Sequence, residues 1–223
     1  MTTRVLTADQ MRATEAAAIE SGAVTGATLM ERAGEAVVTA ILTQGPALRQ
    51  GAHRALVLCG PGNNGGDGFV VARLLRARGW EVAVAFYGRA DRLPPDARRN
   101  HDRLTEVSPF SAETLMQAGR DADALVVVDA LFGIGLSRPL PQELTGPWEA
   151  AAKAGLLVQK NLHLVAVDLP SGWTTDDAQN LGTLAGFDGT LAPVLTVTFH
   201  AMKPVHPVLR EAGQPVVVAS IGL

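Results

Sequence analysis

A glycine-rich stretch that directly follows an apolar run contains the residue types best suited to binding or catalysis. Residues 60–68 hold five glycines together with two asparagines and an aspartate. Glycines occur where a backbone turns sharply or comes close to another group. Where such a turn opens a helix, the unpaired N–H groups and the positive end of the helix dipole suit a phosphate. The spacing Gly60-x-Gly62-x-x-Gly65 matches a dinucleotide-binding fingerprint, although a tight strand-to-helix turn without a ligand would use the same glycines.

Three further stretches place polar groups after apolar runs. They are residues 129–139, 168–172 and 198–204, and they supply Asp129, Asp168, Ser171, His200 and Lys203. In open sheets of parallel strands, ligands bind outside the carboxyl ends of the strands. If each apolar run is such a strand, the four stretches meet at one edge of the sheet and form a site there.

The elements that must position these stretches alternate from Arg54 onward. Runs of β-branched and apolar residues predict strands, and intervening segments of helical periodicity predict helices. Strands are expected at 54–60, 81–87, 124–129, 163–168, 194–199 and 215–221, and helices near 66–78, 95–105, 111–119 and 142–158. This alternation predicts an α/β fold with a mostly parallel, doubly wound sheet in three layers. Residues 172–193 contain no convincing helix, and long loops of this kind are usually lids or binding loops, or are disordered.

Two helices are expected before the first strand. Thr7 and Gln10 form a capping box, with Leu6 and Met11 as a hydrophobic staple, so the first helix should run from there to about Gly22. A second capping box over residues 28–31 predicts the start of the next helix. Neither helix has a place in a strand–helix–strand unit, so both are expected to cover a sheet face or to meet another subunit.

Length and composition exclude several classes of protein. The chain has 223 residues, of which 47% are hydrophobic, and its mean hydropathy is +0.16, as in a globular domain. The net charge of −3 gives no electrostatic case for nucleic acid or for an anionic membrane. The single cysteine rules out an internal disulfide, and no signal peptide or apolar run of about 18 residues is apparent. We therefore expect a cytoplasmic protein.

A nicotinamide-dependent oxidoreductase is disfavoured by the second expected strand. Dinucleotide-binding folds place an Asp or Glu near the end of that strand to hold the ribose, whereas Gly88, Arg89 and Ala90 stand here. No Gly-Lys-Ser/Thr follows the glycines, so a P-loop is absent, and no Cys/His spacing suits zinc. The five histidines are scattered along the sequence, and only His200 is expected near the site.

Four motifs in order resemble the NAD(P)H-hydrate epimerase family, the YjeF N-terminal domain. They are Gly-x-Gly-Asn-Asn-Gly-Gly-Asp-Gly at 60–68, Asp-Ala-Leu-Phe-Gly-x-Gly-Leu-x-Arg-Pro at 129–139, Val-Asp-Leu-Pro-Ser-Gly at 167–172 and Thr-Val-Thr-Phe-x-x-x-Lys-Pro at 196–204. The resemblance covers nearly the whole chain and implies a single Rossmann-like domain over residues 1–223. It implies interconversion of the R and S forms of hydrated NADH and NADPH, which repairs damaged cofactor. It also implies a homodimer and a dehydratase partner, fused or separate.

The resemblance also implies the roles of individual residues. Asn64, Asp129 and Ser171 match the family's potassium ligands, and all three offer oxygen, which suits a hard cation. Asp168 matches the acidic residue beside the nicotinamide ring. The residues implied to bind the substrate are Asn63, Asn64, Gly65, Gly66, Asp67, Gly133, Ile134, Gly135, Leu136, Ser137, Arg138, Pro139, Asp168 and Lys203.

Asp168 is the candidate acid/base for this chemistry. Inverting the hydroxyl-bearing carbon requires loss of the hydroxyl and its return from the other face, through an iminium ion or a ring-opened aldehyde. Both routes give a proton to oxygen and later remove one, which a carboxyl group can do. Lys203 could tune Asp168, bind phosphate or lie on the surface. The alternative is a non-catalytic nucleotide-binding, RNA-binding or scaffold module of the same fold, which would show eroded motifs and a basic face.

Overall fold

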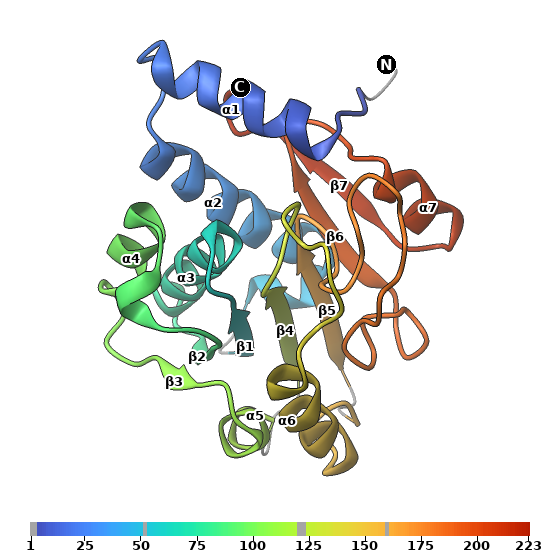
Figure 1. Ribbon diagram of the computed structural model, residues 1–223. Coiled ribbons are helices and arrows are strands. Elements are labelled where there is room, and N and C mark those ends of the chain that lie inside the picture. The colour runs from blue at the N-terminus through green and yellow to red at the C-terminus, as the bar shows by residue number, and fades with distance from the viewer. Residues whose placement is uncertain (1–3, 51–52, 120–123, 159–160) are drawn as a thin grey trace.

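A sheet of parallel strands forms the centre of the computed structural model, which describes residues 4–50, 53–119, 124–158 and 161–223 (Figure 1). The described residues form seven strands in the order β3-β2-β1-β4-β5-β6-β7, and every neighbouring pair is parallel. The order reverses between β1 and β4, which makes that point the switch point of a doubly wound sheet. The predicted fold class is confirmed, with a wholly parallel sheet. The strands are β1 (Arg54–Cys59), β2 (Glu81–Phe86), β3 (Ser108–Pro109), β4 (Leu125–Ala130), β5 (Leu162–Val167), β6 (Val194–Phe199) and β7 (Val216–Ala219).

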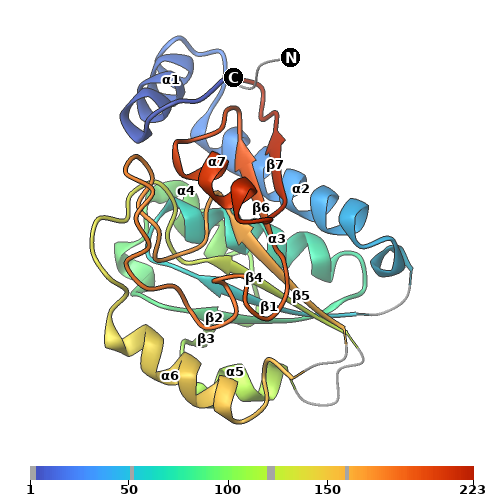
Figure 2. The same ribbon diagram turned by 90° about the vertical axis from the view of Figure 1, so that its right-hand side faces the viewer.

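Helices cover both faces of this sheet, and together the layers give the α/β/α arrangement (Figure 2). On one face lie α2, α3 and α4, and on the other lie α5 and α6. The helices are α1 (Ala8–Glu20), α2 (Gly26–Gln44), α3 (Asn63–Arg76), α4 (Pro95–His101), α5 (Ala112–Ala118), α6 (Gln142–Lys153) and α7 (Val205–Glu211), with short 3-10 turns at Pro46–Arg49 and Ala90–Arg92. Of the helices that the structure describes, none is both long and apolar enough to cross a membrane.

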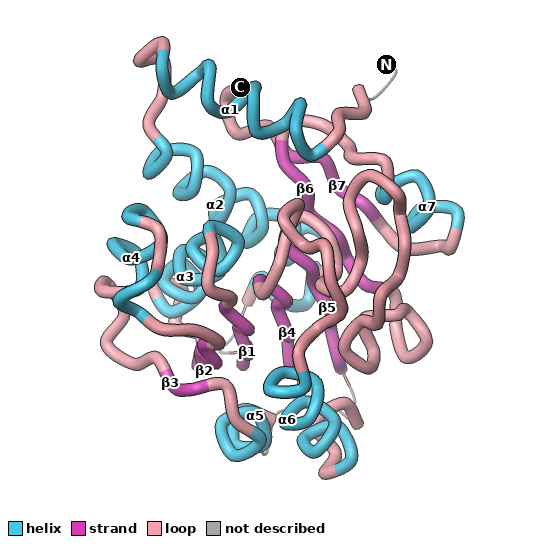
Figure 3. The backbone as a smooth tube through the Cα atoms, in the orientation of Figure 1, coloured by secondary structure: helices cyan, strands magenta, loops and turns pink. Residues whose placement is uncertain are grey.

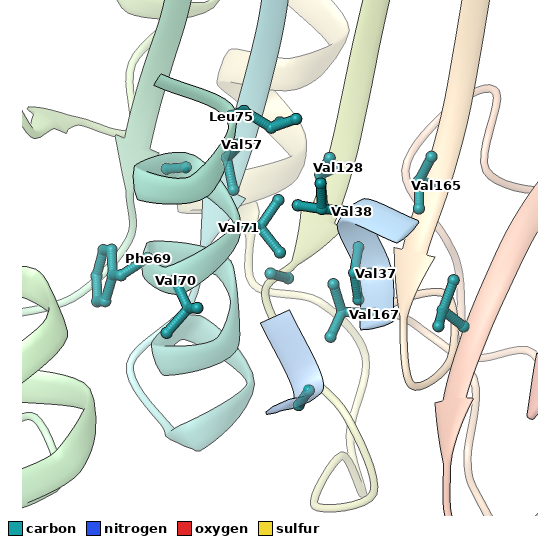
Figure 4. Close-up of a cluster of buried hydrophobic side chains, with 14 of the residues drawn as sticks. Val37, Val38, Val57, Phe69, Val70, Val71, Leu75, Val128, Val165 and Val167 are labelled. Atoms are coloured by element: carbon teal, nitrogen blue, oxygen red, sulfur yellow. The ribbon is translucent and has the colours of Figure 1, made fainter. Parts of the chain in front are cut away.

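Alternating side chains of the strands divide the core into two clusters. On β1, Val57 and Cys59 belong to the cluster under α2 and α3, while Leu56 and Leu58 belong to the cluster under α5 and α6. This is the two-residue period of a strand that is buried on both faces. Figure 4 shows the first cluster, in which Val71 of α3 and valines of α2 meet valines of β1, β4 and β5.

The first helix begins as its capping box predicts. Gln10 N donates to Thr7 Oγ1 at 3.2 Å, and Thr7 N donates to Gln10 Oε1 at 3.0 Å. The helix ends at Glu20, and Gly22 follows with φ +76°. Leu6 and Met11 are buried against Ala201, so the start of α1 is held at the carboxyl edge of the sheet.

The predicted capping box of the second helix is wrong. Thr25 is the N-cap, its Oγ1 accepts a hydrogen bond from Thr28 N at 3.1 Å, and the helix begins at Gly26. Thr25 satisfies the exposed N–H groups one turn earlier, which leaves Thr28 inside the first turn. As expected, α2 covers a sheet face, packing on α3 and β6.

Other boundaries differ from the predicted ones. The third helix begins at Asn63 rather than near residue 66, and α4 and α6 end earlier than predicted. β3 and α7 were not predicted, because β3 has only two residues and because Pro204 and Pro207 make the start of α7 look like a turn in the sequence. The segment between β5 and β6 contains no helix or strand, as predicted, and appears as a long loop in Figure 3.

Candidate active site

A cavity of about 450 Å³ opens at the carboxyl ends of β1, β4 and β5, beside the switch point of the sheet. Its floor is formed by the turn after β1, the start of α3 and the loop after β4, and α1 forms the opposite wall. The predicted site residues that line it are Asn63, Asn64, Asp67, Gly133, Ile134, Gly135, Leu136, Asp168 and Lys203. The sequence prediction that polar groups after several strands meet at one edge is confirmed.

Close backbone packing explains two of the glycines in the first motif. A Cβ at Gly60 would overlap the carbonyl of Leu131, and one at Gly65 would overlap the carbonyl of Gly60. Gly65 and Gly66 lie in the first turn of α3 and are buried, so their side-chain positions face protein rather than the cavity. These glycines let the turn after β1 pack closely against both the loop after β4 and the start of α3, which brings the lining segments together.

No side chain caps the start of α3. Gly62 is the N-cap residue and has no side chain that could accept a hydrogen bond from the first N–H groups of the helix, and both Gly62 and Asn63 line the cavity. The first N–H groups of a helix need partners from outside the helix, and an anionic group of a ligand can supply them. Phosphate binding at this motif therefore stays a prediction, and the uncapped start of α3 is compatible with it.

A buried ion pair joins Asp168 to Lys203. Lys203 Nζ donates to Asp168 Oδ1 at 2.8 Å, to Thr198 Oγ1 at 2.7 Å and to Phe199 O at 3.3 Å. Thr198 Oγ1 also donates to Asp168 Oδ1 at 2.9 Å. Lys203 is 1% exposed, so it is not a surface lysine. Its position supports the tuning of Asp168, because its three donors are all used within the protein.

The two carboxylate oxygens of Asp168 differ in their surroundings. Oδ1 receives the bonds from Lys203 and Thr198, whereas no hydrogen bond from any described residue reaches Oδ2. Oδ2 lies next to Gly133, on the cavity side. Burial disfavours the charged carboxylate, but the Lys203 charge and the two hydrogen bonds outweigh it and lower the pKa of Asp168 below its usual value. Asp168 therefore offers an ionised, unpaired oxygen to the cavity.

His206, rather than His200, holds this part of the site. Its Nε2 donates to Asp168 O at 2.7 Å, and its Nδ1 accepts from Lys203 N at 2.7 Å. Burial lowers the pKa of His206, which favours the neutral ring that these two bonds require. Asp168 has φ +67°, a backbone conformation that non-glycine residues rarely adopt. His206 connects both members of the ion pair through their main chains, and His200 does not line the cavity.

Asp129 and Ser171 lie in direct contact beneath the cavity. Asp129 accepts hydrogen bonds from Ser171 N at 2.7 Å, Ser171 Oγ at 2.7 Å and Leu131 N at 3.1 Å. Both side chains are fully buried, and no salt bridge between described residues reaches Asp129. Burial raises the pKa of Asp129 to about 6, against the opposing effect of these hydrogen bonds. A buried carboxylate without a cationic partner is costly to ionise, so this position suits a bound cation.

Asn64 supplies the third predicted ion ligand from the start of α3. Its Oδ1 lies next to Gly133, and its Nδ2 is buried without a hydrogen-bond partner among the described residues. An unpartnered buried N–H donor needs an acceptor, such as an oxygen of a ligand or of water. No group of three His, Cys, Asp or Glu side chains within the described ranges could hold a metal. Asn64, Asp129 and Ser171 each carry an oxygen atom, the donor type that a hard cation takes.

Two carboxyl groups in the cavity carry raised pKa values. For Asp67, burial raises the pKa well above its usual value, and the nearby charges of Asp168 and Glu15 add to the effect. For Glu15, burial again comes first, followed by the charge of Asp168, while Lys203 and Arg12 oppose the rise. The cavity thus holds three acidic side chains around one buried ammonium.

Sequence reasoning missed the wall contributed by α1. Met11, Arg12 and Glu15 line the cavity, and Arg12 Nη2 donates to Ile134 O at 3.1 Å in the loop after β4. Their spacing on an amphipathic helix is ordinary, so no local signal marks them as site residues. Conversely, residues 137–139 of the predicted substrate loop are exposed and do not line the cavity.

Comparison with known proteins gives a family for this chain. The model of the YjeF-related protein N-terminus matches residues 26–205. A Rhodobacter capsulatus protein named NAD(P)H-hydrate epimerase is 51% identical, and the alignment covers 99% of this chain and all of that protein. A Roseobacter litoralis protein of the same name is 45% identical, with 91% of each chain covered.

A solved structure agrees with this assignment. The crystal structure of yeast ynu0, YNL200c, superposes with a TM-score of 0.74 at 25% identity, covering 96% of this chain and 88% of that one. The likeness therefore extends to the arrangement of the elements that build the cavity. The chain belongs to the family of the YjeF-related protein N-terminus, several members of which are named NAD(P)H-hydrate epimerase.

Proposed function

We propose that this protein is an NAD(P)H-hydrate epimerase, which interconverts the R and S forms of hydrated NADH and NADPH. The relatives with this name, one of them 51% identical over its full length, support the activity. The observation that carries the mechanism is the ionised Asp168, whose unpaired Oδ2 lies at the cavity. The motifs are intact and the net charge is −3, which favours an enzyme over an RNA-binding or scaffold module.

The substrate carries its hydroxyl on the carbon next to the ring nitrogen. Epimerisation removes that hydroxyl and returns it to the other face, without any redox step. In this proposal Asp168 takes a proton from the water that adds, and its negative charge stabilises the positive charge that develops on the ring. Lys203 and His206 hold the carboxylate in place and keep it ionised.

The start of α3 and the loop after β4 are proposed to hold the rest of the dinucleotide. Uncapped N–H groups at Gly62 and Asn63 suit the phosphates, and the lining residues 133–136 would contact the substrate. For residues 137–139, Gly65 and Gly66 the proposal rests on the resemblance alone, because their side-chain positions lie outside the cavity.

A potassium ion is proposed as the cofactor, held by Asn64, Asp129 and Ser171. Its charge would balance that of Asp129, and it would fix the loops after β1, β4 and β5 relative to one another. The three side chains cannot complete the shell of a large cation, so backbone carbonyls or water would supply further oxygens. Asp129→Ala is expected to raise the apparent KM and to remove any potassium dependence, with a smaller effect from Ser171→Ala.

Purified R-hydrate provides the direct test. Incubation with the protein should produce the S form faster than the spontaneous reaction, as followed by chromatography in the presence and absence of potassium. A rate equal to that of the protein-free control would contradict the proposal. The homodimer, the dehydratase partner and the cytoplasmic location are proposed from the family alone.

A further inference from the structure

The ion pair leaves the proposed reaction without a proton donor. Asp168 is paired with Lys203 at 2.8 Å and is therefore ionised at neutral pH, which suits a base that accepts a proton from water. Hydroxide is a poor leaving group, so the departing hydroxyl needs a proton from a different group. That donor must line the same cavity as Asp168.

Among the described residues, few lining side chains carry a proton that can be donated. Lys203 uses its protons within the protein, and the guanidinium of Arg12 is too weak an acid. Glu15 and Asp67 remain. Asp67 lies on α3, one helical turn from Asn64, on the element proposed to hold the phosphates and the ion. Glu15 lies on a different element, α1, and lines the same cavity as Asp168.

We propose that Glu15 is a second catalytic residue, which donates the proton to the departing hydroxyl while Asp168 accepts the proton of the water that adds. This inference rests on the proposed epimerase activity. Glu15 comes from α1, and Asp168 follows β5, so the two carboxyl groups line the same cavity from different elements. The hydroxyl leaves one face of the ring and water adds to the other, so two carboxyl groups from different elements can serve one face each, where an Asp168 that stays ionised cannot also act as the acid.

The charges around Glu15 support this role. It is half-buried and interacts with Asp168, Lys203 and Arg12, and Asp67 is close enough to feel its charge. Burial and the charge of Asp168 raise its pKa, which holds a proton on it closer to neutral pH. One carboxyl of raised pKa and one of lowered pKa in a single cavity is the arrangement of an acid and a base.

The iminium route conserves atoms and charge. The proton of Glu15 moves to the hydroxyl oxygen, the carbon–oxygen bond breaks, and the lone pair of the ring nitrogen forms the iminium ion. Water then adds to the carbon from the other face, its proton moves to Asp168, and the electron pair returns to nitrogen. One water leaves and one enters, nothing is oxidised, and the proton on Asp168 returns to Glu15 through cavity water.

Glu15→Gln tests the proposal with little change of volume. We expect kcat to fall about 10²-fold with KM nearly unchanged, because general acid catalysis contributes roughly 10²–10⁴-fold. The wild-type rate should fall on the alkaline side as Glu15 loses its proton, and the variant should lack that limb of the pH profile. Glu15→Asp keeps the acid and should recover part of the rate. Glu20→Gln, an exposed position on the same helix, serves as the matched control.

The outcomes separate the two proposals. If the wild type epimerises the hydrate and Glu15→Gln shows the wild-type kcat and alkaline limb, the role of Glu15 is overturned while the epimerase stands. If the wild type does not epimerise the hydrate, the proposed function fails first. An equal loss in Glu15→Gln and Glu15→Asp, with the alkaline limb retained in both, would indicate a structural role and would also overturn the inference.

Discussion

Asp168 and Lys203 form the charged centre of the cavity, and each is buried only because the other is present. Asp168→Asn removes the proton acceptor, so we expect kcat to fall roughly 10²–10⁴-fold. The same change leaves the Lys203 ammonium buried without a carboxylate, which should lower the free energy of unfolding by about 3–5 kcal/mol. Initial rates of epimerisation and urea denaturation measure the two effects. Near-normal turnover in folded Asp168→Asn protein would contradict the role of Asp168.

The variant Lys203→Met tests the effect of Lys203 on the pKa of Asp168 separately from the catalytic role of Asp168. Without the ammonium, burial is uncompensated and the pKa of Asp168 should rise, so the acid limb of the rate profile moves to higher pH. Because the pKa of Asp168 is lowered in the folded protein, the pair stabilises the fold above the unfolded pKa of about 3.9, and this stabilisation is lost as the pH falls through the folded pKa.

Two further variants control this experiment. The double variant Asp168→Asn with Lys203→Met removes both charges of this pair and should regain part of the lost stability while remaining inactive. Lys153→Met, at an exposed lysine, should leave the pH profile unchanged. An acid limb in Lys203→Met that coincides with that of the wild type would show that the ammonium does not set the pKa of Asp168.

The site residues that the sequence could predict are those that follow strands. Asp129, Asp168 and Lys203 stand at or just after apolar runs, and the edge of a parallel sheet collects such positions. Glu15 stands in the middle of a helix, and only the packing of α1 across the cavity makes it a site residue. Which histidine belongs to the site was equally hidden, because His206 acts from α7, whose Pro204 and Pro207 indicate a turn in the sequence.

The contact between the end of β1 and the loop after β4 depends on Gly60. A methyl group there would overlap the carbonyl of Leu131, and a backbone carbonyl cannot move aside as a flexible side chain can. We expect Gly60→Ala to destabilise the protein by about 1–3 kcal/mol or more, as overpacking does. Gly62→Ala is the matched control for stability, since a Cβ at Gly62 meets nothing within 4 Å. Equal urea midpoints for the two variants would contradict the requirement for close approach.

The same glycines explain why the start of α3 was predicted too late. Glycine is a poor helix former, so the sequence of residues 63–68 indicates a loop. In the structure these residues form the first turns of α3, because packing against the ends of β1 and β4 and against Met30 of α2 requires small residues there. Tertiary packing overrides local propensity at this point, and single-sequence reasoning has no access to it. The long strands and α3 itself were predictable because their apolar patterns are strong.

The order of the strands brings together segments that are far apart in the sequence. Asn64 follows β1, Asp129 ends β4 and Ser171 follows β5, and these three strands are adjacent in the sheet. Strand pairing shows this adjacency directly, and it lies at the switch point of the sheet. A ligand bound by all three segments would hold the whole carboxyl edge together, so its effect should appear in the stability of the entire molecule.

The potassium proposal therefore predicts a salt-specific stabilisation. If potassium is present at ten times its dissociation constant, it should stabilise the folded protein by about 1.4 kcal/mol. For a chain of this size, that corresponds to a rise in Tm of roughly 3–6 °C. The measurement compares Tm in potassium chloride with Tm in choline chloride at equal ionic strength, since choline is too large for the shell of Asn64, Asp129 and Ser171. Asp129→Ala should abolish the difference between the salts, Ser171→Ala should reduce it, and Asp177→Ala, at an exposed aspartate, should keep it. A wild-type Tm that is the same in both salts would exclude a potassium ion that stabilises the fold, because a ligand that binds only the folded state must raise Tm.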